Sequence, residues 1–216
     1  MTTLANLTSL QDQLDAFKAG RAAANPDLFA LRQRETDNLI ASGIAKQSFS
    51  IGESAPDFTL PNAQGGDLTL SVTLKKGPVV LTFYRGEWCP YCNLTLAAYQ
   101  SMLPQIQHAG ATLIAVSPQQ PDFARSMIDK ANLTFPVLSD LGNHVARRYR
   151  LVFTLPESLR QYSAVIPQSN GDESWELPMP ATFVIQPDGA IRLAFIPPDY
   201  TQRLEPSAIM AALTQG

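Results

Sequence analysis

The chain has 216 residues, of which 45% are hydrophobic, and its formal net charge is −3. This length is enough for one sizeable domain with an appendage. The slight acidic excess argues against nucleic acid or anionic membranes as partners, and no apolar run reaches the roughly 18 residues that a membrane-spanning helix needs.

The first 48 residues predict a helical extension. Apolar residues recur there at spacings of three and four, which places them on one face of a helix. They are Leu7, Leu10, Leu14 and Phe17, then, after a break at Pro26, Leu28, Leu31, Leu39, Ile40 and Ile44. These helices either pack on the main domain or form an interface with a partner, for example a second copy of the chain in a homodimer. The first residues lack the basic start and continuous apolar stretch of a signal peptide, so we expect a cytoplasmic protein.

Residues 49–216 predict an α/β domain in which helices flank a mixed central sheet. Short extended segments and turns fill residues 51–70. Runs of β-formers typical of buried strands occupy 78–84, 111–118 and 135–140. Helical patterns occupy 93–110, 120–133, 142–151 and 205–215. The sequence 179–196 predicts a final pair of antiparallel strands around a Pro-Asp-Gly turn.

One stretch of this domain, residues 153–178, fits no regular element well. It is too long for an ordinary connection between two elements. We therefore expect an insertion that is either a functional lid or a flexible segment.

The chain has two cysteines, and both lie in residues 83–96, which read FYRGEWCPYCNLTL. In the cytoplasm a close cysteine pair is more often catalytic or metal-binding than a structural disulfide. A structural zinc site usually needs four protein ligands, and the two histidines, His108 and His144, lie far from the pair in sequence. We therefore expect no metal and no cofactor, which leaves a redox pair or two inert thiols.

The spacing places both cysteines at the start of a helix. Proline is favoured at the first helical position, so Pro90 predicts Cys89 at the N-cap and Cys92 in the first turn. Free backbone N–H groups and the positive end of the helix dipole there stabilise a thiolate, which is the reactive form of cysteine. At the helix tip Cys89 is expected to be the more exposed, whereas Cys92 turns towards the sheet. A pair so placed after a buried strand is typical of redox chemistry.

Four stretches follow in the order seen in peroxiredoxins and their alkyl-hydroperoxide-reductase-like relatives. They are GESAPDFTLPN, VVLTFYRGEWCPYC, FPVLSDLGNHVARRYRL and MPATFVIQPDGAIR. The chain thus resembles a peroxiredoxin over roughly residues 50–215. The resemblance implies a thioredoxin-like fold and a thiol-dependent peroxidase that reduces hydrogen peroxide or organic hydroperoxides. It also implies that thioredoxin or a similar dithiol donor reduces the oxidised enzyme.

The match to the family's active-site pattern, Pro-x-x-x-Thr-x-x-Cys, is partial. In this register Cys92 is the attacking cysteine, Cys89 replaces the threonine and Arg85 replaces the leading proline. Peroxiredoxins also carry an arginine just before the strand that reads TFVI here, and this chain has Pro180 there instead. The resemblance therefore predicts a slow peroxidase without the usual arginine to orient peroxide.

A second resemblance, to thioredoxins, gives a different order of attack. The sequence WCPYC is similar to a thioredoxin or glutaredoxin motif, and Pro180 looks like the cis-proline of thioredoxins. This predicts a cis peptide bond between Met179 and Pro180. It also makes Cys89 the attacking residue and Cys92 its partner, so the order of attack stays open.

Several neighbours are candidates for supporting roles. Arg85 either stabilises the thiolate or points away from it, and Trp88 is expected to pack beside the pair. Glu87 either shuttles protons or is an ordinary loop carboxylate. Three further arginines on a predicted helix either reach the site or face solvent: Arg147, Arg148 and Arg150.

Three functions are compatible with these patterns. The first is a thiol-dependent peroxidase, and the second is a thiol-disulfide oxidoreductase that acts on protein disulfides. The third is a non-enzymatic redox sensor or interaction protein that binds a partner through its N-terminal helices.

Overall fold

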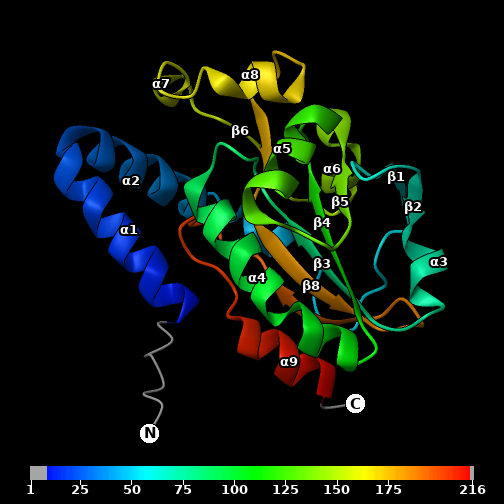
Figure 1. Cartoon of the computed structure of the whole chain (residues 1–216). Coiled ribbons are helices and arrows are strands. Elements are labelled where there is room, and N and C mark those ends of the chain that lie inside the picture. The colour runs from blue at the N-terminus through cyan, green and yellow to red at the C-terminus, as the bar shows by residue number, and fades with distance from the viewer. Residues whose placement is uncertain (1–8, 215–216) are drawn as a thin grey trace, which may run out of the picture.

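The fold is built around a five-stranded sheet, which Figure 1 shows in the computed structural model, where residues 9–214 are described. The strand order is β5-β4-β3-β8-β9. The strands are β3 (Val79–Phe83), β4 (Thr112–Ser117), β5 (Val137–Ser139), β8 (Ala181–Ile185) and β9 (Ile191–Phe195). β3, β4 and β5 pair in parallel, whereas β8 pairs antiparallel with both β3 and β9. The expected α/β fold with a mixed sheet and an antiparallel final pair is therefore confirmed.

Helices and loops cover both faces of the sheet, which explains why its central strands are apolar throughout. All five residues of β3 and all five of β8 are buried. One face packs against α4 (Pro90–His108), α5 (Pro121–Ala131) and α9 (Pro206–Thr214). Residue 215, which the predicted last helix included, lies outside the described residues.

The other face of the sheet has an aromatic core. The fully buried Tyr149 ring lies 5.1 Å from the Phe83 ring and 5.4 Å from the Phe183 ring, measured between centroids. This face is covered by four short elements and the segment that follows the last of them. They are β1 (Thr59–Pro61), β2 (Asp67–Thr69), α3 (Leu70–Leu74) and α6 (His144–Arg148).

The N-terminal extension forms a pair of helices, α1 (Leu10–Ala24) and α2 (Pro26–Ala41), which Figure 1 shows beside the domain. The expected break at Pro26 is present, because Asn25 caps α2 and Pro26 occupies its first position. α1 is docked on α4: Leu14 is fully buried, and the Phe17 and Tyr91 rings meet edge to face at 5.2 Å. Leu7, which the periodicity placed on the same face, lies outside the described residues.

The segment 153–178 contains regular structure, so the expectation of an irregular stretch is wrong. Two short antiparallel strands close it, β6 (Val152–Thr154) and β7 (Glu176–Pro178), with helices α7 (Glu157–Arg160) and α8 (Val165–Asn170) between them. These elements are too short to show a clear periodicity in sequence, but they share a small core. That core is Leu155, Leu159, Ile166 and Leu177, with Leu31 of α2 packed against it.

The Met179–Pro180 peptide bond is trans, which overturns the expected cis-proline. No peptide bond of residues 9–214 is cis. The backbone here runs from β7 directly into β8, and Met179 N–H donates to the Leu151 carbonyl at 2.8 Å. A residue before proline favours such an extended conformation, and trans is the lower-energy form of an X–Pro bond.

Within residues 9–214, no helix is both long and apolar enough to cross a bilayer.

We expect Leu14→Ala to lower the free energy of unfolding by about 2–5 kcal/mol, because it removes a fully buried side chain between α1 and α4. Ile40→Ala is the matched control, since Ile40 is 47% exposed on α2 and its loss should change stability by less than about 0.5 kcal/mol. Urea unfolding measures both. Equal, small effects would mean that α1 is not part of the cooperative unit.

Candidate redox site

Both cysteines lie where a tight loop after β3 enters α4. Cys89 is the N-cap of α4, Pro90 is its first residue and Cys92 lies in its first turn, as the spacing predicted. The loop turns at Gly86, whose φ of 149° is a conformation that other residues rarely adopt. A Cβ atom at Gly86 would lie 2.4 Å from Trp88 Nε1, so the loop closes over Trp88 only with glycine there.

The two thiols are reduced and buried, with 2% of Cys89 and 1% of Cys92 exposed. The expectation of a more exposed Cys89 is therefore wrong, because surrounding elements cover the helix tip. The sulfurs differ instead in what they face. Cys89 lines a cavity of about 480 Å³, here called the large cavity, and Cys92 lines a cavity of about 10 Å³, here called the small cavity.

An arginine that the sequence analysis missed lies next to Cys92. The Nη2 atom of Arg203 is 3.6 Å from the Cys92 sulfur, and the side chain is buried. Its Nη1 atom donates to the carbonyls of Tyr200 and Gln202, which holds the guanidinium in place. The position before TFVI holds Pro180 instead of the usual arginine, but Arg203 supplies an arginine at Cys92 from elsewhere in the chain. Arg203 follows β9 and lies 111 residues from Cys92 in sequence, so no local pattern could have indicated this contact.

Arg85 points into the site rather than away from it. Its guanidinium carbon lies 4.9 Å from the centre of the Trp88 ring and 4.3 Å from that of Tyr200. The side chain is 7% exposed, and its Nε atom has no hydrogen-bond partner among the described residues. Stacking between two aromatic rings thus keeps the positive charge of Arg85 beside the cysteine pair.

The surroundings of Cys92 favour its thiolate. Burial is the largest single influence and raises the pKa of Cys92, and the hydrogen bond that the Cys89 thiol donates is the largest of the influences that lower it. The charges of Arg203 and Arg85, and a hydrogen bond from the Arg85 backbone N–H, act in the same direction. Together they lower the pKa of Cys92 to about 5.

The same contacts keep Cys89 protonated. Burial raises the pKa of the Cys89 thiol, and so do its hydrogen bond to Cys92 and the negative charge there. Arg85 and Arg203 only partly offset these effects. At neutral pH the pair therefore consists of a Cys92 thiolate and a Cys89 thiol that donates a hydrogen bond to it.

Of the other candidate residues, Trp88 and Pro180 lie beside the cysteines, whereas Glu87 is engaged elsewhere. Trp88 lies beside Cys89 in the wall of the large cavity, and Pro180 lines both cavities. Glu87 is held in an ion pair with Lys130 at 2.5 Å and accepts a hydrogen bond from Ser126 at 2.7 Å. Burial raises the pKa of Glu87, but these two contacts together outweigh burial and keep the carboxyl ionised. An ionised carboxylate in these contacts suits a role in anchoring the loop to α5 rather than in proton transfer.

The three arginines near α6 serve other contacts. Arg147 pairs with Glu176 at 2.5 Å, and Arg150 lies over the Phe49 ring and donates to the Gln47 carbonyl. Arg148 is exposed. The solvent-facing interpretation of these arginines therefore holds, and the positive charge at the cysteines comes from Arg85 and Arg203.

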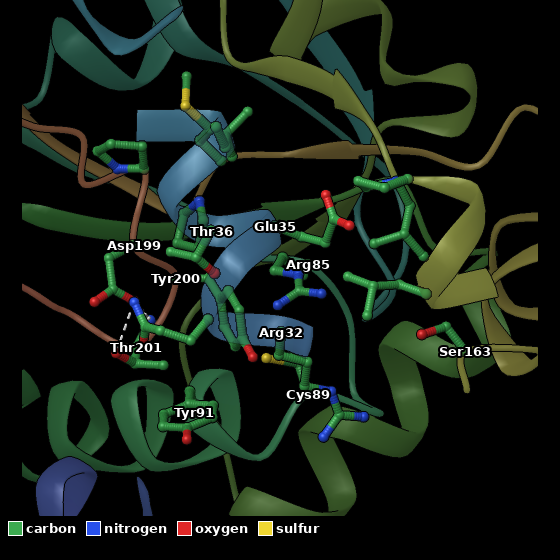
Figure 2. A pocket seen from close by; sticks show the side chains of 18 of the residues that line it. Arg32, Glu35, Thr36, Arg85, Cys89, Tyr91, Ser163, Asp199, Tyr200 and Thr201 are labelled. Atoms are coloured by element: carbon green, nitrogen blue, oxygen red, sulfur yellow. Dashed lines mark hydrogen bonds between the residues drawn. The ribbon is translucent and has the colours of Figure 1, made fainter. Parts of the chain in front are cut away.

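The large cavity is enclosed by parts of the chain that are far apart in sequence. Its walls come from α1, α2, the loop at residues 85–91, the segment 153–165 and the loop 198–201. Figure 2 shows Arg32, Arg85, Cys89 and Tyr200 close together in its central part. The N-terminal helices and the segment 153–165 thus form part of a pocket on the Cys89 side of the pair.

A model of the AhpC/TSA family matches residues 51–194, which is most of the chain. The chain belongs to the AhpC/TSA family. Among curated relatives, a chloroplastic peroxiredoxin Q of Triticum aestivum is 32% identical over 134 residues, which cover 62% of this chain and 60% of that protein. One of Sedum lineare is 27% identical over 164 residues, covering 76% and 83% respectively. The chain therefore spans less than two thirds of the wheat relative's length.

Solved structures show the same fold for this AhpC/TSA-family chain. The peroxidoxin BcpB of Mycobacterium tuberculosis superposes with a TM-score of 0.62 at 22% identity, over 77% of this chain and 97% of that one. Peroxiredoxin Q of Xanthomonas campestris superposes with a TM-score of 0.58 at 20% identity, over 73% and 90%. The thioredoxin-like fold implied by the resemblance is thus confirmed, and α1 and α2 lie outside the residues that the family model matches.

We expect the ultraviolet absorbance of the Cys92 thiolate to persist as pH falls below neutral and to disappear near pH 5. A lowered pKa means that the thiolate is lost only when pH falls through that lower value, whereas an ordinary cysteine, with a pKa of about 8.5, is mostly protonated at neutral pH. Arg203→Ala should move the midpoint up by about 1–3 pH units, because it removes an opposite charge in contact with the sulfur. Arg148→Ala, an exposed arginine elsewhere, is the control, and equal midpoints in both variants would exclude Arg203 as the stabilising charge.

Proposed function

We propose that this chain is a thiol-dependent peroxidase that reduces hydrogen peroxide or organic hydroperoxides with Cys92 and Cys89. The observation that supports it best is the contact of Cys92 with Arg203 and with the Cys89 thiol, since both favour a thiolate. Membership of the AhpC/TSA family and the similarity to peroxiredoxin Q proteins point the same way. A redox sensor also uses a low-pKa cysteine beside a resolving cysteine, so turnover, and not this geometry, separates the peroxidase from the sensor interpretation.

In the proposed reaction the Cys92 thiolate attacks one oxygen of the peroxide, and the O–O bond breaks. Cys92 becomes a sulfenic acid, and the other oxygen leaves as an alkoxide or hydroxide that takes up a proton. Arg203 is well placed to stabilise the negative charge that develops on the leaving oxygen. Cys89 then attacks the sulfenic sulfur, water leaves, and a Cys89–Cys92 disulfide forms.

This assignment follows the peroxiredoxin register and not the thioredoxin register. Cys89 is the weaker candidate for the first attack, because its pKa is raised and it acts as a hydrogen-bond donor. The raised pKa of Cys89 also suits a resolving thiol, which reacts only after Cys92 has been oxidised. A thioredoxin-like dithiol protein is the reductant we propose on the basis of the family resemblance.

The second candidate function, a thiol-disulfide oxidoreductase, has one observation in its favour. Cys89, which would attack first in that case, is the cysteine that lines the large cavity. The neutral state of its thiol and the trans bond before Pro180 count against it. We therefore keep it as the alternative that mutagenesis must exclude.

The location and the oligomeric state are also proposals. We propose a cytoplasmic protein, since the free thiols suit a reducing compartment. A homodimer through the N-terminal helices remains our proposal for its assembly. In its favour, α2 buries only Thr36 in the single chain and exposes 47% of Ile40.

We expect Cys92→Ser to abolish peroxide consumption and Cys89→Ser to permit a single oxidation of Cys92 without turnover.

In the wild type, mass spectrometry after peroxide treatment should show one intramolecular disulfide, which is a loss of two protons per chain. A wild type that forms a stable sulfinic acid instead would exclude Cys89 as the resolving thiol. If Cys89→Ser removes the first oxidation and Cys92→Ser retains it, the thioredoxin register is correct. If neither change affects peroxide consumption, the chain is not a peroxidase.

We also expect hydrogen peroxide to oxidise Cys92 at least about tenfold faster than cumene hydroperoxide. The small cavity beside Cys92 holds about 10 Å³, close to the space of one water molecule, so a bulky peroxide must displace its walls. Phe195→Ala should reduce this preference, since Phe195 lines the small cavity. Stopped-flow fluorescence measures both rates, and equal rates in the wild type would show that peroxide reaches Cys92 by another path.

A further inference from the structure

More positively charged than negatively charged side chains line the large cavity. The charged side chains that line it are Lys18, Arg21, Arg32, Arg85, Glu35 and Asp199. Lys18 and Asp199 form an ion pair at 3.7 Å, and Glu35 accepts a hydrogen bond from Ser158 at 2.8 Å. In a chain with a net charge of −3, this excess of positive charge is local to the cavity.

The three arginines of the cavity lack partners of opposite charge. Within residues 9–214, the guanidinium groups of Arg21, Arg32 and Arg85 form no ion pair, and the buried Arg85 Nε has no hydrogen-bond acceptor. They also repel one another: burial lowers the pKa of Arg32, Tyr200 partly opposes this, and the charges of Arg21 and Arg85 lower it further. A bound anion would relieve this repulsion and satisfy the exposed donors.

The size and lining of the cavity suit a small organic molecule. Its volume of about 480 Å³ falls within the range of roughly 300–1,000 Å³ that is typical of small-ligand sites. Phe29, Leu39, Phe153 and Leu159 supply apolar walls. A folded protein cannot enter a space of this size, so the occupant that fits is a small molecule with an anionic group and an apolar part.

The chemistry at the cavity wall indicates what this molecule does. The sulfur that faces the cavity is that of Cys89, which is protonated in the reduced protein and therefore a poor nucleophile for a peroxide. In the oxidised protein, Cys89 is one half of a disulfide and can be attacked by a thiolate. The occupant of this cavity is thus better suited to be a reductant than an oxidant.

We propose that the large cavity binds a small thiol that carries carboxylate groups, and that this thiol reduces the Cys89–Cys92 disulfide. Its carboxylates pair with Arg32 and Arg21, next to Arg85, while its thiolate reaches Cys89. The proposal rests on the proposed peroxidase function only for the origin of the disulfide. It adds a small-molecule route of reduction beside the thioredoxin-like one.

The reduction uses two molecules of the thiol. The first thiolate attacks the Cys89 sulfur, the bond between the two cysteines breaks, and Cys92 leaves as a thiolate. The low pKa of Cys92 makes it the better leaving group of the pair. A second thiolate attacks the sulfur of the bound thiol in the mixed disulfide, so the small disulfide leaves and Cys89 takes up a proton.

The test measures how fast small thiols of different charge reduce the full-length protein after its disulfide has been formed with diamide. This oxidant makes the assay independent of any peroxidase activity. The three thiols are glutathione, which carries carboxylates, 2-mercaptoethanol, which is neutral, and cysteamine, which is cationic. Each reduction rate is divided by the concentration of the thiolate form of the thiol, because the thiolate is the species that reacts. Trp88, which lies beside Cys89, provides a fluorescence signal.

We expect glutathione to be at least about tenfold faster than the other two thiols on this scale, which is the effect of one or two charge-assisted hydrogen bonds. Arg32→Ala should remove most of this advantage, and Arg32→Lys should restore part of it. Arg34→Ala, an exposed arginine of the same helix outside the cavity lining, should leave the advantage unchanged.

Three outcomes would overturn the proposal. The rates could follow thiolate concentration alone, whatever the charge of the thiol. Arg32→Ala could slow all three thiols equally, which would indicate a structural role. Glutathione could fail to reduce the disulfide while a thioredoxin-type dithiol protein succeeds, which would leave the protein route as the sole one.

Discussion

The Arg203 guanidinium lies 3.6 Å from the Cys92 sulfur, in a site that is almost closed to water. A thiolate that has lost its hydration is stable only where positive charge and hydrogen-bond donors replace the lost water. Arg203 is held there by the fold, since the hydroxyl of the fully buried Tyr99 on α4 donates to the neighbouring Leu204 carbonyl at 3.0 Å. The helix that carries the cysteine thereby also fixes the arginine that stabilises it.

Arg85 acts on both cysteines from the wall of the large cavity. Its charge lowers the pKa of both cysteines, while its side chain forms part of the wall of the large cavity. The hydrogen bond between the thiols then separates their roles, because the residue that donates it is kept neutral and the residue that accepts it becomes the thiolate. The direction of this hydrogen bond thus raises the pKa of Cys89 and lowers the pKa of Cys92, although the two side chains are chemically identical.

The N-terminal helices extend the site beyond the part of the chain that the AhpC/TSA model matches. α1 is docked through the buried Leu14, and the hydrogen bond from Ser158 to Glu35 links the segment 153–178 to α2. These contacts place Arg32 in the wall of the large cavity, which Cys89 also lines (Figure 2). The N-terminal helices and the segment 153–165 thus add a pocket beside the reactive residues of the domain.

The sequence by itself determined the features that depend on neighbouring residues. The alternation of apolar runs and helical patterns predicted the α/β fold, and Pro90 predicted the start of α4 and hence the positions of Cys89 and Cys92. Such features arise from propensities and spacings within about one turn or one strand, which a sequence displays directly. The resemblance to peroxiredoxins extended this reading to the thioredoxin-like topology.

The tertiary structure alone decided the environment of the thiols. Arg203 reaches Cys92 across 111 residues, Arg85 points inward because Tyr200 and Trp88 stack on it, and the short elements of 153–178 are ordered by a core shared with α2. The bond before Pro180 is trans because the chain passes straight from β7 into β8, whatever the residue type suggested. Charge stabilisation and packing depend on distances in space. A folded chain brings together residues that are far apart in sequence, and no local sequence pattern predicts which of them will be in contact.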